Sequence, residues 1–163
     1  MRLTAPAALN AVACAGIAAA SDPGAVTLHV DQIEGPAEVH TVHLTLATAL
    51  RGLGVSFIST ADADGDGLLS DETPRNHSVA VSYLDSTQLV NDLAWTVTPL
   101  GRDDGDDVLE ADEKFVLNIS LRALDPTPVG GMPINLTIRP NDGAFLGIEK
   151  RTLSSITPSM LLR

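Results

Sequence analysis

Residues 113–121, which read Glu-Lys-Phe-Val-Leu-Asn-Ile-Ser-Leu, decide the fold class of this chain. Phe115, Leu117 and Ile119 fall on one side of an extended chain, and Asn118 and Ser120 fall on the other, because successive side chains of a strand point to opposite faces. Alternation of this kind predicts a strand that packs one face on a core and leaves the other in water.

The same alternation recurs on both sides of this segment, with Gly, Pro and Asp between the repeats. No helix-length pattern separates the repeats, which argues against a parallel βαβ sheet. Residues 23–163 therefore predict a mainly β chain, an Ig-like antiparallel β-sandwich preceded by a short N-terminal α-helix. Further strands are expected at 26–30, 42–46, 55–60, 78–84, 93–98, 134–139 and 144–150, before an apolar end at Met160–Leu162.

The core of this sandwich must consist mainly of aliphatic residues. The chain has 163 residues, the length of one domain, and only 3% of them are aromatic. Its few large core side chains are expected to be Phe57, Tyr83, Trp95, Phe115 and Phe145.

The first 22 residues form a separate segment. Alanine dominates residues 1–20, and a helix is expected there that ends at the turn formers Ser21–Gly24. The segment also resembles a secretory signal, and it is too short and too weakly apolar to predict a membrane span. One apolar face of the helix has three-and-four spacing and consists of Leu9, Val12, Ala13, Gly16 and Ile17.

The charge of the chain restricts its partners. A formal net charge of −11 repels phosphate backbones, so nucleic acid is not an expected partner. Cys14 is the single cysteine, which excludes an internal disulfide and a multi-cysteine zinc site. The sequence contains no nucleophile elbow, phosphate-binding glycine loop or His-Glu-x-x-His motif, so no enzyme activity is predicted.

Residues 62–72, Asp-Ala-Asp-Gly-Asp-Gly-Leu-Leu-Ser-Asp-Glu, carry the sharpest local motif. Carboxylates at positions 1, 3 and 5 and a glycine at position 6 are typical of a calcium-binding loop. Thr73 stands where such a loop has its bidentate carboxylate, and the flanks are not helical in pattern, so a solvated acidic loop stays open as an alternative. The candidate calcium ligands are Asp62, Asp64, Asp66, Leu68, Ser70 and Glu72.

A second acidic stretch has less regular spacing and is interpreted first as a solvated turn. Whether the two stretches meet in one site is left open by the sequence. The candidate residues of this second site are Asp103, Asp104, Asp106 and Glu110.

Asn76-His77-Ser78, Asn118-Ile119-Ser120 and Asn135-Leu136-Thr137 are N-glycosylation sequons. Strand alternation places Asn118 and Asn135 on polar faces. N-linked glycans at Asn76, Asn118 and Asn135 are therefore an expectation for a surface protein.

The order of motifs from Val39 onward resembles that of the archaeal flagellins, the archaellins of the archaellum filament. The resemblance is carried by Ser82-Tyr83-Leu84-Asp85, by Ala94-Trp95-Thr96-Val97, by Val108–Phe115, and by Ile138–Ala144 followed by Leu146–Arg151 and Ile156.

This resemblance implies a structural subunit of an extracellular motility filament, assembled from identical or closely related copies. In such a filament the apolar N-terminal helices would bury one another and the β-domains would face outward. The resemblance thus implies a subunit interface made of Leu9, Val12, Ala13, Gly16 and Ile17. Residues 1–22 are shorter and richer in alanine than the family's long apolar helix, which implies a truncated remnant or a divergent relative. The alternative function is a secreted calcium-binding adhesion module of the sandwich type. A hydrolase that uses Asp64 and Asp66 is a more remote alternative, because both aspartates lie in a loop that is expected to be exposed, without an apolar pocket.

Overall fold

The structure, a computed structural model, describes residues 17–19, 26–31, 38–48, 54–141, 145–152 and 159–162. Every regular element in these ranges is a β-strand, and every strand pairing is antiparallel. The predicted mainly β class and antiparallel pairing are confirmed.

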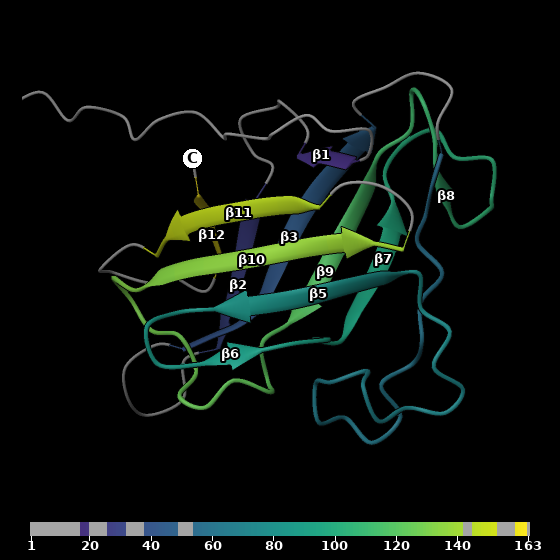
Figure 1. Ribbon diagram of the computed structural model, residues 1–163. Coiled ribbons are helices and arrows are strands. Elements are labelled where there is room, and N and C mark those ends of the chain that lie inside the picture. Colours follow the sequence, from purple (N-terminus) through teal and green to yellow (C-terminus); the bar gives the residue numbers. More distant parts are fainter. Residues whose placement is uncertain are drawn as a thin grey trace, which may run out of the picture.

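Two sheets form the body of the molecule and lie in two layers whose strands cross (Figure 1). The larger sheet has the order β12-β2-β3-β9-β7, and β1 also pairs with β3. Its strands are β1 (Ile17–Ala19), β2 (Val26–Asp31), β3 (Glu38–Thr48), β7 (Trp95–Pro99), β9 (Phe115–Ser120) and β12 (Ser159–Leu162).

The second sheet has the order β11-β10-β5-β6, and a separate pair joins β4 to β8. The strands of the second sheet are β5 (Val79–Leu84), β6 (Leu89–Val90), β10 (Pro133–Pro140) and β11 (Leu146–Arg151). The small pair consists of β4 (Val55–Ser56) and β8 (Val108–Leu109).

The core lies between the two layers and follows from the alternation in the sequence. Every second residue of β5, β9 and β10 is buried, as the two-residue period of a strand requires. The buried aliphatic and aromatic side chains of these strands include Val79, Val81, Tyr83, Phe115, Leu117, Ile119, Ile134, Leu136 and Ile138.

The period breaks once, in β3, where buried positions step from Val39 to Val42. The pairing with β2 shifts between His29 and Val30, so that Thr41 opposes His29 while Val39 opposes Val30. His40 is the extra residue of a β-bulge, which lets both halves of β3 keep their apolar side chains on the core side.

Four of the five large side chains expected in the core are there. Phe57 meets Trp95 and Phe115 edge to face, with ring centroids 6.0 and 5.9 Å apart, and Tyr83 is fully buried. The prediction for Phe145 is wrong, because this side chain is 59% exposed. The buried residues of β11 are Leu146 and Ile148, so its neighbour Phe145 has the outward parity.

Two predicted elements differ from the structure. Most of the expected N-terminal helix lies outside the described residues, but Ile17–Ala19 form β1 instead, because β3 extends past its pairing with β2 and offers a free edge at Leu46–Thr48. The strand expected at 55–60 ends at Ser56. Beyond it the backbone forms single hydrogen bonds to loops, such as Phe57 N to Asp107 O.

Candidate functional site

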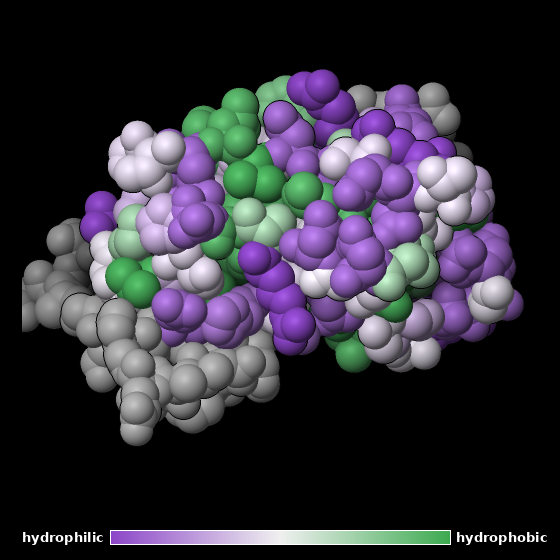
Figure 2. Space-filling view, turned by 90° about the horizontal axis from the view of Figure 1, so that it is seen from below, coloured by the Kyte–Doolittle hydropathy of each residue, from purple (hydrophilic) through white to green (hydrophobic). Residues whose placement is uncertain are grey.

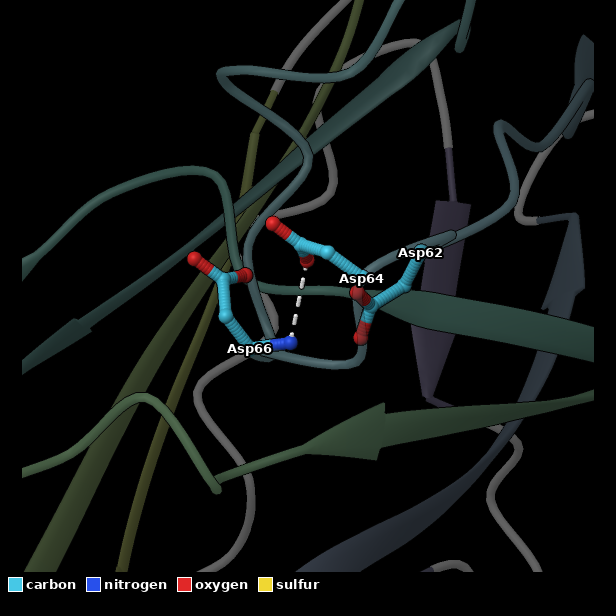
Figure 3. A group of neighbouring side chains, drawn as sticks. All are labelled: Asp62, Asp64 and Asp66. Carbon is cyan, nitrogen blue, oxygen red and sulfur yellow. Dashed lines mark hydrogen bonds between the residues drawn. The ribbon is translucent and has the colours of Figure 1, made fainter.

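The loop between β4 and β5 holds the acidic motif, in the lower right of Figure 1. Its three aspartates, Asp62, Asp64 and Asp66, each offer a carboxylate oxygen, and these oxygens lie within 4.8 Å of one another (Figure 3). The sequence therefore identified side chains that the fold brings together.

The backbone amides of the loop hold these carboxylates in place. Asp62 accepts hydrogen bonds from Gly65 N at 2.8 Å and Gly67 N at 3.1 Å, while Asp66 accepts one from Leu68 N at 2.8 Å. Because a carboxylate has about four acceptor sites, lone pairs remain for a cation after these bonds are made. The arrangement is able to hold a hard divalent cation, and the calcium site stays a prediction.

The other predicted ligands have different surroundings. Leu68 forms a β-bridge with Leu93, and Ser70 is exposed. Glu72 accepts a hydrogen bond from Ala63 N at 2.5 Å and is not in the group formed by the three aspartates. Its carboxylate closes the base of the loop.

The second acidic stretch gathers a different set of residues from the one expected. Asp103 and Asp104 lie together with Glu113, whereas Asp106 and Glu110 are not in this group. Glu113 is buried and accepts hydrogen bonds from Asp104 N at 3.3 Å and Glu110 N at 3.1 Å. The sequence did contain an indication that Glu113 points inward, because it lies two residues before Phe115 and strand alternation places both side chains on the core side. The two acidic groups are separate.

Sequence reasoning missed Asp92, the most connected buried charge among the described residues. It is 5% exposed and has a φ of 63°. Its carboxylate lies 2.7 Å from Arg75 Nη2 and 2.9 Å from His77 Nε2, and its carbonyl accepts a hydrogen bond from Leu69 N at 2.8 Å. Arg75 and His77 are 15 or more residues away from Asp92 in the chain, so no local sequence pattern predicted this cluster.

Tyr83 and Asp85 form a second polar pair, at the end of β5. The Tyr83 hydroxyl donates to Asp85 Oδ2 at 2.9 Å, and burial, followed by this bond and the Asp85 charge, raises the pKa of Tyr83. Burial opposes ionisation of Asp85, but hydrogen bonds from Thr87, Gln88 and Tyr83 outweigh it and lower the pKa of Asp85 to about 2. The hydrogen bonds of this pair stabilise the turn between β5 and β6.

The three sequons lie in different surroundings. Asn76 is exposed in the loop before β5, while Asn118 and Asn135 are half-buried within β9 and β10. The polar placement expected from alternation is therefore found for both strand residues. The hydrogen bonds of the three amides also differ.

Of the predicted subunit interface, Leu9, Val12, Ala13 and Gly16 lie outside the described residues, and Ile17 pairs with Thr48 as part of β1. No helix in the described part of the chain is long and apolar enough to cross a membrane.

The fold and its exposed acidic loops define a class of protein, a two-layer antiparallel β-sandwich with a strongly acidic surface. No family model matches the sequence, and no curated protein matches it. Among solved structures the chain is similar to the crystal structure of archaeal flagellin FlaB1 from Methanocaldococcus jannaschii, with a TM-score of 0.63 and 11% sequence identity. The likeness covers 91% of this chain and 94% of the flagellin chain, and at this identity it shows a shared fold.

Proposed function

We propose that this chain is a structural subunit of an extracellular archaeal filament of the archaellum type. The observation that carries the proposal is the likeness of fold to archaeal flagellin FlaB1 over nearly the full length of both chains. The ordered sequence motifs from Val39 onward agree with that likeness, although only 11% of residues are identical. Rotation of such a filament would serve motility, and its place would be the cell surface.

The surface of the sandwich suits an outward-facing domain in salty water. The net charge is −11, and the right half of the face in Figure 2, on the side where the acidic β4–β5 loop lies, is mostly hydrophilic. Like charge on neighbouring copies disfavours unspecific association of the outer domains. Assembly would then depend on a defined contact, repeated head to tail, which generates a helical filament when the rotation does not close.

The N-terminal segment is the proposed source of that contact. Leu9, Val12, Ala13 and Gly16 would form an apolar stripe that neighbouring copies bury, and about 25 cal/mol is gained per Å² of apolar surface removed from water. A charge placed in the stripe should therefore block assembly, whereas a charge on the opposite side of the same helix should not.

Electron microscopy of the full chain, with Val12→Asp and Ala11→Asp as a matched pair, tests this proposal. The wild type and Ala11→Asp are expected to form filaments, and Val12→Asp is expected to stay dispersed with an unchanged circular dichroism spectrum. A wild-type chain that stays monomeric at high concentration and high salt would contradict the filament and favour the secreted adhesion module. Equal assembly of both variants would contradict the role of the N-terminal stripe.

A further inference from the structure

The three sequons differ in what the folded protein does with each asparagine amide. Asn76 is exposed, its Oδ1 accepts a hydrogen bond from Thr60 Oγ1 at 3.0 Å, and its Nδ2 has no hydrogen-bond partner in the described part of the chain. Nδ2, the atom that would carry a sugar, therefore forms no hydrogen bond to the described residues that a glycan would have to replace.

Asn118 is in the opposite situation, in the middle of β9. Its Oδ1 accepts from His43 on β3, and its Nδ2 donates to Thr96 and Thr98 Oγ1 on β7, both at 3.4 Å. The side chain thus ties three adjacent strands together. A glycosylated amide keeps one N–H and is unable to serve both threonines, and a sugar would have to displace these contacts.

Asn135 also uses its amide within the fold. Its Nδ2 donates to Leu84 O at 2.9 Å, at the end of the pairing between β10 and β5. Because β10 has a neighbour on each side, a sugar on this half-buried amide would crowd β5 or β11.

The other two residues of the Asn76 sequon, His77 and Ser78, are packed against the rest of the folded chain. His77 lies against Asp92, and the Ser78 hydroxyl, which a transfer enzyme must reach together with the asparagine, donates to Ser56 O at 2.7 Å. Ser78 is 9% exposed. The sequon is therefore available to an enzyme only before this loop packs, although Asn76 itself stays exposed afterwards.

We propose that the folded protein carries an N-linked glycan at Asn76 and at neither of the other two sequons, and that the glycan is added before the β4–β5 loop packs. In the transfer, Asn76 Nδ2 bonds to the anomeric carbon of a lipid-linked oligosaccharide, and the bond from that carbon to the lipid phosphate oxygen breaks. Nδ2 gives up one proton, which passes to water or to the departing lipid phosphate. Chains modified at Asn118 or Asn135 lose hydrogen bonds between strands and do not reach the folded state. The inference rests on the proposed function only in requiring export.

Glycopeptide mass spectrometry of the full chain, exported by cells that perform N-glycosylation, tests the site. Glycan is expected on Asn76 in most folded molecules and at less than about a tenth of that occupancy on Asn118 and Asn135. Asn76→Gln should abolish the glycan with little change in Tm, whereas Asn118→Gln should keep it and lower the Tm. An unmodified Asn76, or comparable occupancy at either strand residue, would overturn the site.

The order of events has its own test, with a purified oligosaccharide transferase and a lipid-linked oligosaccharide as the probe. A peptide of residues 71–82 is expected to accept the glycan, and the folded, unmodified chain is expected to accept at least tenfold less. Equal modification of both would overturn the order of addition and folding. Filament formation is scored separately by electron microscopy, so filaments without glycan contradict this inference alone and glycosylated monomers contradict only the filament.

Discussion

At the scale of single residues, the acidic side chains of this protein divide into those in water and those the fold uses. Asp112 is exposed, whereas Asp92 is buried between Arg75 and His77. Both have a positive φ, of 71° and 63°. The two aspartates share a backbone conformation and differ in surroundings, which makes them a matched pair for measuring the contribution of burial.

Asp92→Asn is expected to lower the free energy of unfolding by about 2 kcal/mol, because the neutral amide loses the charge-assisted contacts that the buried carboxylate makes with Arg75 and His77. Asparagine tolerates a positive φ as well as aspartate does, so the change isolates the charge. Urea unfolding measures the difference, and Asp112→Asn, the control, is expected to change it by less than about 0.5 kcal/mol. Equal stabilities of the two variants would show that the Asp92 ion pairs contribute nothing.

The lowered pKa of Asp85 is expected to make the folded protein less stable in acid. Its pKa in the folded protein is about 2, below its ordinary value of 3.8, so its contribution is complete above about pH 4 and is lost as the pH falls towards 2. After allowance for solvent screening the loss is about 1–2 kcal/mol. Unfolding midpoints measured from pH 5 to pH 2 should fall less steeply in Asp85→Asn than in the wild type. Parallel profiles would contradict the assignment.

At the scale of elements, the β4–β5 loop is long but anchored. Leu68 bridges to Leu93, Leu69 N donates to Asp92 O, and Ala94 N donates to Gly67 O. These contacts tie the acidic loop to the segment that leads directly into β7. Within the loop, Gly67 and Gly65 both have a positive φ, of 90° and 77°.

Gly67→Ala is expected to destabilise the protein more than Gly65→Ala. Alanine at either position has a backbone cost of about 1 kcal/mol or more, because L residues disfavour this conformation. At Gly67 a Cβ atom would also lie 2.9 Å from Ala123 N, whereas at Gly65 it would meet nothing within 4 Å. Thermal unfolding of the two variants separates the steric effect from the backbone effect, and equal Tm values would contradict the close approach.

Calcium is expected to raise the Tm, because a divalent cation relieves the repulsion between Asp62, Asp64 and Asp66. Removal of calcium with a chelator should reverse the rise. A variant carrying Asp62→Asn and Asp64→Asn should lose it, whereas Asp112→Asn should keep it. An unchanged Tm in the wild type would mean that the loop is a solvated acidic turn.

At the scale of the whole molecule, Trp95 connects the two layers. It is the only tryptophan of the chain, it lies in β7 of the larger sheet, and its Nε1 donates to Val79 O of β5 in the other sheet at 2.9 Å. Its ring meets Phe57 edge to face. Fluorescence of Trp95 therefore reports directly on whether the two sheets are packed together.

Unfolding in urea is expected to be a single transition, with Trp95 fluorescence and far-ultraviolet circular dichroism sharing one midpoint. One continuous core between the sheets is the physical reason, because neither sheet keeps its apolar face dry alone. A fluorescence midpoint at lower urea than the circular dichroism midpoint would show that the sheets separate before their strands unfold.

The strand pattern was determined by the sequence alone, because a strand buried on one face imposes a two-residue period that can be read from local composition. β5, β9 and β10 were predicted in this way, and so was the clustering of Asp62, Asp64 and Asp66, which are close in the chain. In each of these cases neighbours in sequence carry the information.

Only the tertiary structure decided which distant segments meet. The position of Asp92 against Arg75 and His77, the third carboxylate supplied by Glu113, and the pairing of β1 with the free end of β3 depend on register between strands far apart in sequence. Local sequence patterns do not predict that register, because it is set by how all the apolar faces pack together into one core.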